Sequence, residues 1–293
     1  MQYKALECKS ALNKIKKPIL PYRWDLNIYR GCEHGCEYCF AMYTHTYLEE
    51  TEYFQTVYYK KNIVEVLEKE LSSPKWQGEV INIGGITDSY QPIEEQLQLT
   101  REVLKVMIKY KNPIIISTKS DLILRDLDLL QELSKVACVN IACTITTMDE
   151  AIRKKLEPGA VSSMRRFVAL KKIKEETNAV VGVHMMPVVA YLNSSLSNLR
   201  TIYQFAEKIG ADYVLPGTLY LRGPTRKNFL DFLRQYDLVR FQQFQAIYTQ
   251  APIKKEYKQK FHQQIARLEK EYHQTSNYMQ AINNKKEELQ SLK

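Results

Sequence analysis

The stretch that decides the fold reads RGCEHGCEYCF and runs from Arg30 to Phe40. It places Cys32, Cys36 and Cys39 in one short loop with the spacing C-x3-C-x2-C. Thiolates bind iron in iron–sulfur clusters, and they also bind zinc. Because no fourth cysteine lies nearby in the sequence, the loop predicts a cluster in which one iron atom has no protein ligand.

The spacing alone leaves two other interpretations open, a zinc site and unliganded core cysteines. A structural zinc site needs four protein ligands, so His34 or His45 would have to supply the fourth. His34 lies between two of the cysteines, which makes simultaneous chelation awkward. Gly31 and Gly35 let the loop curl tightly and bring backbone amides towards cluster sulfurs, which favours iron.

Length and composition are those of a globular protein. The chain has 293 residues, of which 45% are hydrophobic and 26% are charged. No apolar run reaches the roughly 18 residues that a membrane span needs, and residues 1–9 lack the apolar core of a signal peptide. Six cysteines, three of them clustered, suit metal binding in a reducing compartment better than a disulfide framework. We therefore expect a cytoplasmic protein without a membrane span.

The charge balance is basic. The formal net charge is +9 and the sequence pI is near 9.0. A basic surface suits a polyanionic partner such as nucleic acid. The lysines are spread widely along the chain, so a charge that mainly keeps the protein soluble is the alternative interpretation.

Downstream of the loop, apolar runs typical of strands alternate with helical periodicity. The strands are expected at 24–29, 80–84, 113–118, 138–144, 179–186 and 212–215, and the helices at 62–71, 94–110, 122–136, 163–177 and 194–209. Such alternation predicts a parallel sheet, either a partial or full barrel or an open doubly wound sheet. In both architectures the loops at the carboxyl ends of the strands converge and carry the chemistry.

Composition shifts divide the chain into three parts. Residues 1–24 are a basic N-terminal arm, residues 25–224 form the strand–helix region, and residues 225–293 are rich in Gln, Lys, Tyr and Glu. The last part has an amphipathic stripe with helical spacing, which predicts a helical extension that packs on the barrel or on a partner. The stripe consists of Tyr257, Phe261, Ile265, Leu268 and Tyr272.

The order of motifs is similar to that of a known family. C-x3-C-x-aromatic-C, with Tyr38 as the aromatic residue, resembles the signature of the radical S-adenosylmethionine (radical SAM) superfamily. Longer runs resemble its spore photoproduct lyase-like branch, and they lie at 29–36, 86–92, 118–120, 125–130 and 156–158. The resemblance covers about residues 22–224 and implies a partial (β/α)6 TIM-type barrel. It also implies a 4Fe–4S cluster and S-adenosylmethionine as cofactors.

The resemblance implies roles for the loop itself and for the end of the next strand. Cys32, Cys36 and Cys39 would bind the cluster, S-adenosylmethionine would chelate the remaining iron, and Tyr38 would pack near its adenine. In the superfamily, the backbone after the second strand meets the methionine amino group. The residues that match this segment are Gly84, Gly85, Thr87 and Asp88.

Polar residues after the next two strands are further candidates for binding S-adenosylmethionine. Lys119, with Ser120 beside it, would pair with its carboxylate, or is a surface lysine. Thr144 and Thr146 would hydrogen-bond its ribose or carboxylate, or they reflect ordinary strand propensity.

Three other side chains have two interpretations each. Arg165 and Arg166 begin a helix and would reach a carboxylate or phosphate, or form a solvated face. Spore photoproduct lyase uses a cysteine as a hydrogen donor, and Cys143 has a comparable position at the barrel mouth. No motif around Cys143 matches, so a small buried core residue is the interpretation that we prefer.

The resemblance implies reductive cleavage of S-adenosylmethionine to a 5′-deoxyadenosyl radical, with flavodoxin or ferredoxin as the electron donor. The expected substrate is a nucleic acid or nucleotide, in a lyase-like reaction. The alternatives are a radical SAM enzyme that modifies a protein or small metabolite, and a non-catalytic zinc protein. Residues 225–293 lack the Gly-rich segment with an Arg-Met pair that many relatives share, so a shared substrate is not implied.

Overall fold

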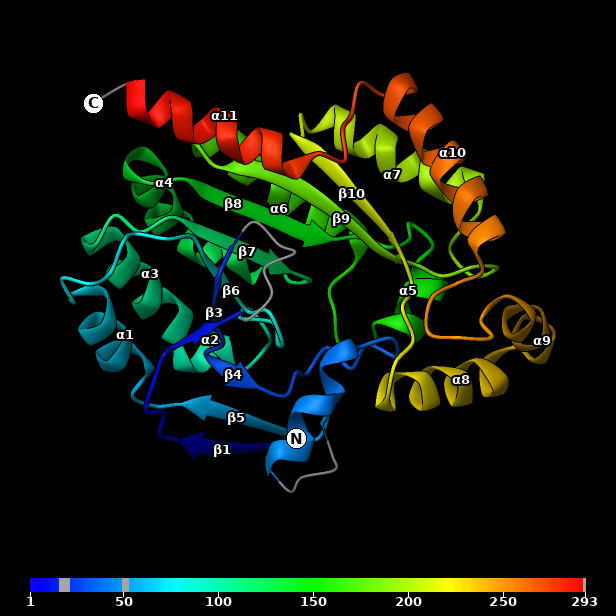
Figure 1. Ribbon diagram of the computed structural model, residues 1–293, viewed down its shortest axis with the longest axis horizontal. Coiled ribbons are helices and arrows are strands. Elements are labelled where there is room, and N and C mark those ends of the chain that lie inside the picture. Colours follow the sequence, from blue (N-terminus) through cyan, green and yellow to red (C-terminus); the bar gives the residue numbers. More distant parts are fainter. Residues whose placement is uncertain (16–21, 49–52, 292–293) are drawn as a thin grey trace.

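The computed structural model describes residues 1–15, 22–48 and 53–291, and its larger sheet contains the strands expected from the sequence. In spatial order this sheet runs β10-β9-β8-β7-β6-β3-β2 (Figure 1). All of these strands run parallel to their neighbours except β2, at the edge. Their bounds are β2 Leu12–Lys14, β3 Trp24–Leu26, β6 Ile81–Ile83, β7 Ile114–Thr118, β8 Val139–Thr144, β9 Val180–Val188 and β10 Tyr213–Thr218.

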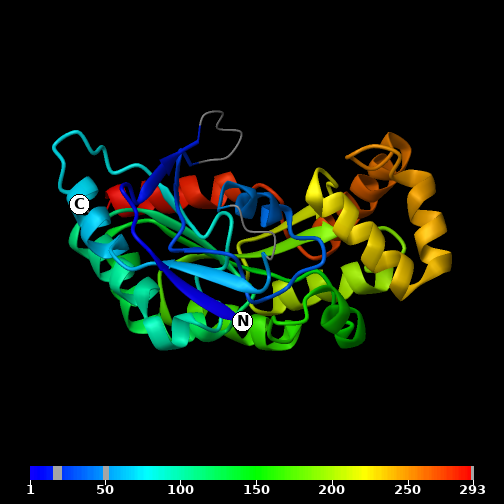
Figure 2. The same cartoon turned by 90° about the horizontal axis from the view of Figure 1, so that it is seen from below.

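Helices that follow the strands cover one face of this sheet, which Figure 2 shows from the side. They are α1 Ile63–Leu71, α3 Leu99–Lys109, α4 Leu127–Val136, α6 Ser163–Glu176 and α7 Leu196–Lys208. Each presents an apolar stripe to the sheet, because its buried residues recur every three or four positions. The main core forms between the two layers, from strand residues such as Ile116 and Ile141 and helix residues such as Leu104 and Leu170.

A smaller sheet flanks the cysteine loop. It consists of β1 Gln2–Leu6, β5 Thr56–Lys60 and β4 Tyr29–Arg30, with β5 in the middle. The loop leaves β4, continues into the 3-10 helix η1 Phe40–Leu48, and the chain returns along β5. The ends of the loop are therefore fixed by the pairing of β4 with β5.

The C-terminal part contains α8 Pro224–Tyr236, α9 Leu238–Ile247, α10 Lys255–Glu271 and α11 Tyr278–Ser291. The stripe residues Phe261, Ile265 and Leu268 of α10 join the main core beside α7. Helix α11 lies on the opposite face of the large sheet (Figures 1 and 2), where Ile282 packs against Ile115 and Cys138. No helix in the described ranges is long and apolar enough to cross a membrane.

The parallel α/β arrangement is as predicted, and several local predictions differ from the structure. The segment 24–29 forms two short strands in different sheets, β3 and β4, instead of one. The helix expected at 94–110 is broken into α2 Glu94–Leu97 and α3, because Gln98 has a left-handed backbone. Strands β1, β2 and β5 and the short helix α5 Glu150–Leu156 were not predicted, and the helix expected at 122–136 begins as the 3-10 segment η2 Leu122–Asp126.

Candidate functional site at the cysteine loop

The three clustered cysteines are enclosed by protein. Cys32 and Cys36 are buried, and Cys39 is partly buried between the apolar clusters that contain the other two. Burial raises the pKa of Cys36 to about 12, and the charge of Lys119 acts against that rise. Iron binding displaces thiol protons, so a nearby cation assists it. The donor set, three thiols in one enclosed loop, therefore fits an iron–sulfur cluster.

The thiols do not surround a single point. Among the residues that the structure describes, no three His, Cys, Asp or Glu side chains are arranged to hold one metal ion. A cubane cluster does not need such an arrangement, because each thiolate binds a different iron atom. His34, the fourth zinc ligand considered above, contacts other groups: its Nε2 lies 3.0 Å from Asp88 Oδ2, and its Nδ1 lies 3.2 Å from the carbonyl oxygen of Gly159.

Asp88 links the cysteine loop to the end of β7. Its carboxylate accepts hydrogen bonds from the Thr118 hydroxyl at 2.7 Å and from the backbone N–H of Lys119 at 2.8 Å. Burial works against ionisation of Asp88, but His34 and these donors outweigh it and hold the pKa of the carboxyl below its usual range. Both carboxylate oxygens already have protein partners, so Asp88 acts here as an anchor for His34.

A second buried carboxylate, Glu157, organises the other side of the loop. Arg166 Nη1 lies 2.6 Å from Glu157 Oε2, and neither side chain is exposed. Glu157 Oε1 accepts hydrogen bonds from the Tyr38 hydroxyl and, at 3.0 Å, from the Thr146 hydroxyl. Burial raises the pKa of Glu157, but Arg166 and Lys119 more than offset this and leave it lowered. Arg166 also donates to the carbonyl oxygen of Thr144 at 2.7 Å, so it joins α6 to the end of β8.

Lys119 interacts electrostatically with both of these carboxylates. Its ammonium is 5.8 Å from the centre of the Tyr38 ring. It forms no ion pair within the described part of the chain. Burial lowers the pKa of Lys119, but Cys36, Glu157 and Asp88 together raise it above its usual value. The result is a charged amine near the loop that is free to pair with a carboxylate.

The glycines after β6 approach their neighbours closely. Gly84 has φ +84°, a conformation that other residues rarely adopt, and a Cβ on Gly85 would lie 2.5 Å from a carboxylate oxygen of Asp25. Next to them, the Thr87 hydroxyl donates to the carbonyl oxygen of Gly31 at 2.6 Å, which ties this segment to the cysteine loop. Ser120, by contrast, turns back on its own segment: its hydroxyl accepts a hydrogen bond from the N–H of Leu122 at 3.2 Å.

The structure thus brings Tyr38, Thr87, Asp88, Lys119 and Thr146 to the cysteine loop or to the residues that hold it. The sequence motif at 156–158 indicates no role for Glu157, and the sequence alone leaves Arg166 with two interpretations. Arg166 is a buried partner of Glu157, whereas Arg165 pairs with Asp121 at the surface. Cys143 belongs to the main core, as preferred above.

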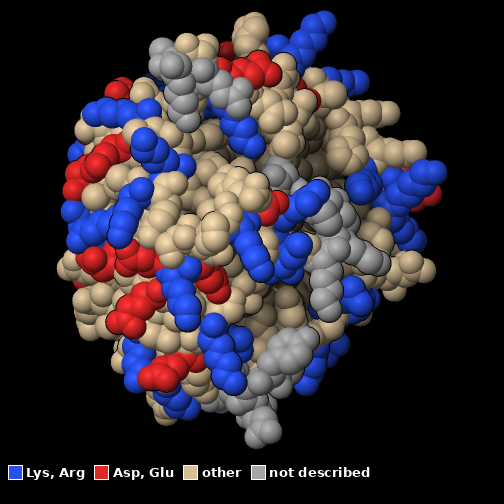
Figure 3. Space-filling view, turned by 60° about the vertical axis from the view of Figure 1, so that its left-hand side comes forward, with Lys and Arg blue, Asp and Glu red and all other residues tan. Residues whose placement is uncertain are grey.

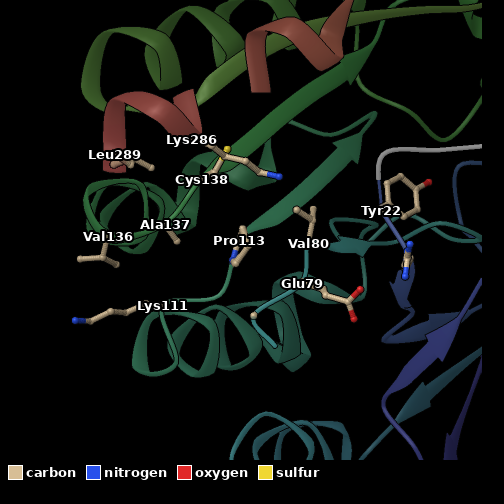
Figure 4. Close-up of a pocket in the computed structure, with 12 residues that line it drawn as sticks. Tyr22, Glu79, Val80, Lys111, Pro113, Val136, Ala137, Cys138, Lys286 and Leu289 are labelled. Atoms are coloured by element: carbon tan, nitrogen blue, oxygen red, sulfur yellow. The ribbon is translucent and has the colours of Figure 1, made fainter. Parts of the chain in front are cut away.

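A cavity of about 500 Å³ lies elsewhere, at the amino ends of the strands and beside α11 (Figure 4). Cys138 and Lys286 lie side by side in it, while Lys111 points away. It shares no lining residue with the cysteine loop. The chemistry of the thiols, rather than the size of this cavity, identifies the candidate site.

Comparison with known proteins agrees with this site. Residues 26–193 match the family model of the Radical SAM superfamily, and the chain belongs to that superfamily. Its members use a 4Fe–4S cluster and S-adenosylmethionine, which are therefore the cofactors of this enzyme.

Uncharacterised proteins of Mycobacterium bovis and Mycobacterium tuberculosis are 31% identical to it over 272 residues, which cover 90% of this chain and 79% of each relative. A spore photoproduct lyase variant with bound AdoMet and dinucleoside spore photoproduct has a similar fold, with a TM-score of 0.68 and 13% identity. The match covers 92% of this chain and 79% of the lyase chain. It confirms the predicted likeness to that branch at the level of the fold.

Proposed function

We propose that Cys32, Cys36 and Cys39 hold the 4Fe–4S cluster and that the ends of β6, β7 and β8 hold S-adenosylmethionine. The observation that carries this proposal is the anchoring of one enclosed three-thiol loop to those strand ends through Thr87, Asp88 and the Tyr38–Glu157 contact. When bound, the cluster and S-adenosylmethionine supply a 5′-deoxyadenosyl radical that abstracts hydrogen from a substrate. The protein orients both and excludes water.

We assign the side chains around the loop as follows. The unpaired ammonium of Lys119 binds the carboxylate of S-adenosylmethionine, because charge-assisted hydrogen bonds are the strongest available there. Gly84 and Gly85 offer backbone to its amino group, and Tyr38 packs on its adenine. Thr144 and Ser120 border the same space.

Asp88, Thr87 and Thr146 already bond to protein groups, so we propose that they hold the loop and strand ends in place. This differs from the direct contacts with S-adenosylmethionine that the resemblance suggested for them.

The fold supports the finer architecture expected from the sequence. We propose that residues 25–224 form a partial (β/α)6 TIM-type barrel, with residues 1–24 as an arm and residues 225–293 as a helical extension. The parallel order β3-β6-β7-β8-β9-β10 supports the barrel core, and α8 to α11 support the extension. None of the six cysteines, all within the described residues, forms a disulfide, which suits a reducing cytoplasm.

Anaerobic reconstitution with iron and sulfide, reduction with dithionite and assay of 5′-deoxyadenosine test the enzyme activity. We expect deoxyadenosine from the wild type and none from Cys36→Ala. Cys138→Ala is the matched control, because Cys138 lies at the far cavity, and it should remain active. Absence of deoxyadenosine from the wild type, or full activity of Cys36→Ala, would refute the proposal. A colourless protein that carries zinc and no iron would support the zinc alternative.

For the substrate, we propose a nucleic acid or nucleotide and a lyase-like reaction. Two observations support it: the net charge of +9, and the likeness in fold to a lyase that binds a dinucleoside spore photoproduct. Figure 3 shows Lys and Arg side chains spread over one face, several of them around a hollow. Flavodoxin or ferredoxin would supply the electron.

Binding of single- and double-stranded DNA measured against salt concentration tests the substrate. A nucleic-acid substrate predicts affinity that falls steeply with salt, as bound counterions are released. Affinity that is absent, or independent of salt, would favour the alternative, a protein or small-metabolite substrate.

A further inference from the structure

Helices α8 and α9 lie outside the region that matches the family model, yet their apolar residues share one cluster with residues of the cysteine loop. Figure 1 shows α8 beside η1, which continues from the loop, and the two elements are in contact. Cys36 and Tyr38 share one apolar cluster with residues of this C-terminal part. Those residues include Phe229, Leu233, Phe241, Phe244, Tyr248 and Ile253. The C-terminal helices thus bury a side of the loop that the strand–helix region does not cover.

Two polar side chains of α8 bond to the backbone of the loop. The Thr225 hydroxyl donates to the carbonyl oxygen of Cys39 at 2.8 Å. The Asn228 side-chain amide donates to the carbonyl oxygen of Glu37 at 2.9 Å and to its carboxylate at 3.2 Å. Thr225 and Asn228 are three residues apart, so they project from the same face of the helix. The two accepting carbonyls belong to Glu37 and Cys39, in the segment 36–39 that begins and ends with the last two cysteines.

Two residues define where α8 begins, directly before the face that contacts the loop. Gly223 has φ +55°, which favours glycine, and Pro224 occupies the first turn of the helix, where its missing N–H leaves no bond unmade. Thr225 is only 2% exposed, so little water competes for its hydrogen bond. Bonds from outside the ligand set fix the orientation of metal ligands, and an apolar shell controls water access and redox potential.

We propose that α8 and α9 are part of the cluster site, with Thr225 and Asn228 as positioning residues that hold the backbone between Cys36 and Cys39. The apolar residues of the two helices shield the cluster from water and oxygen. This inference rests on the proposed function, because it takes the three cysteines as cluster ligands. It gives the C-terminal extension a role at the cluster site, which no motif in the sequence indicates.

The test compares Thr225→Val and Asn228→Ala with wild type as full-length, anaerobically reconstituted protein. Three quantities are measured without S-adenosylmethionine: iron per chain, the rate at which the cluster absorbance is lost in air, and the midpoint potential of the cluster. Loss of an outer bond commonly weakens a metal site about tenfold or more, so we expect about tenfold faster loss and a shifted potential. Thr225→Ser keeps the hydroxyl and should behave as wild type.

Thr201→Val is the control, because the Thr201 hydroxyl also donates to a backbone carbonyl, that of Ser197 at 2.9 Å, but within α7 and not to the cysteine loop. It should leave all three quantities unchanged. Wild-type rates and potential in both test variants would overturn the inference. Asn228 is only partly buried, so we expect Asn228→Ala to fold. This variant therefore tests the inference even if Thr225→Val does not fold. A wild-type protein that binds no cluster would instead refute the proposed function.

Discussion

Arg165 and Arg166 are neighbours at the start of α6, yet they lie in opposite environments. Arg166 is fully buried against Glu157, whereas the Arg165 side chain is 62% exposed and pairs with Asp121. Removing one partner of a buried pair leaves the other charge without compensation, which costs about 3–5 kcal/mol. An exposed pair contributes about 1 kcal/mol or less.

We therefore predict that Arg166→Met lowers the free energy of unfolding by about 3 kcal/mol or more, while Arg165→Met changes it by less than about 1 kcal/mol. Denaturant titration of the two variants measures the difference. If both variants lose a similar free energy of unfolding, the buried Arg166–Glu157 pair does not stabilise the fold more than the exposed Arg165–Asp121 pair does.

His184 provides a pH-dependent contribution to stability. Its Nδ1 lies 3.0 Å from the Ser117 hydroxyl, and its Nε2 lies 3.3 Å from the Tyr213 hydroxyl. The Tyr213 hydroxyl donates to Asn140, so His184 Nε2 donates to Tyr213, and in the neutral ring Nδ1 accepts from Ser117. Burial, with the charge of Lys119, lowers the pKa of His184 from 6.5 to about 4.

Between pH 6.5 and about 4, the unfolded chain binds a proton at this histidine that the folded chain does not. The free energy of unfolding should therefore fall as the pH decreases through this window, by about 3 kcal/mol at most. His184→Gln should remove this slope, and His273→Gln, at an exposed site, should retain it. Denaturant titrations at several pH values test this; an unchanged slope in His184→Gln would show that other groups cause it.

At the scale of elements, the cysteine loop is held closely against β5. Gly31 has φ +84°, and a Cβ there would lie 2.3 Å from the carbonyl oxygen of Thr56. Gly78 also has a positive φ, +64°, but a Cβ there would meet nothing within 4 Å. The two glycines separate the cost of backbone conformation from the cost of a steric clash.

Gly78→Ala should cost about 1 kcal/mol for its left-handed backbone alone. Gly31→Ala should cost about 2 kcal/mol more than that, because the β5 backbone has to move. It should also lower the iron bound per chain after reconstitution, which Gly78→Ala should not. Equal stability and iron content in the two variants would mean that the fit of the loop against β5 is not required.

Sequence patterns predicted the alternating elements because the strands contain continuous apolar runs, as in Ile114-Ile115-Ile116 of β7, and the helices have apolar residues at helical spacing. They did not predict β1, β2 or β5, which are short and pair with distant segments, so no local pattern specifies them. The cysteine spacing and strand-end positions pointed to the site. They could not show that Asp88 bonds to His34 or that Glu157 bonds to Arg166, because those contacts depend on tertiary packing.

At the scale of the whole molecule, the cysteine loop lies where several parts of the chain meet. The small sheet holds the ends of the loop. The ends of β6, β7 and β8 hold one side of it through Thr87, Asp88 and the Tyr38–Glu157 contact. Helix α8 holds the other side through Thr225 and Asn228. An amphipathic stripe in the sequence indicated that the C-terminal helices bury one face, but it could not indicate what they cover. Only the assembled fold shows that this part of the chain reaches the loop.

Mössbauer spectroscopy of protein reconstituted with ⁵⁷Fe, with and without S-adenosylmethionine, tests the central claim most directly. Three thiolates leave one iron of a 4Fe–4S cluster without a protein ligand. We predict that S-adenosylmethionine changes the signal of one iron atom and leaves the others unchanged, and that Cys36→Ala abolishes the cluster spectrum. A cluster spectrum that is identical with and without S-adenosylmethionine, or a protein that binds no iron, would contradict the account.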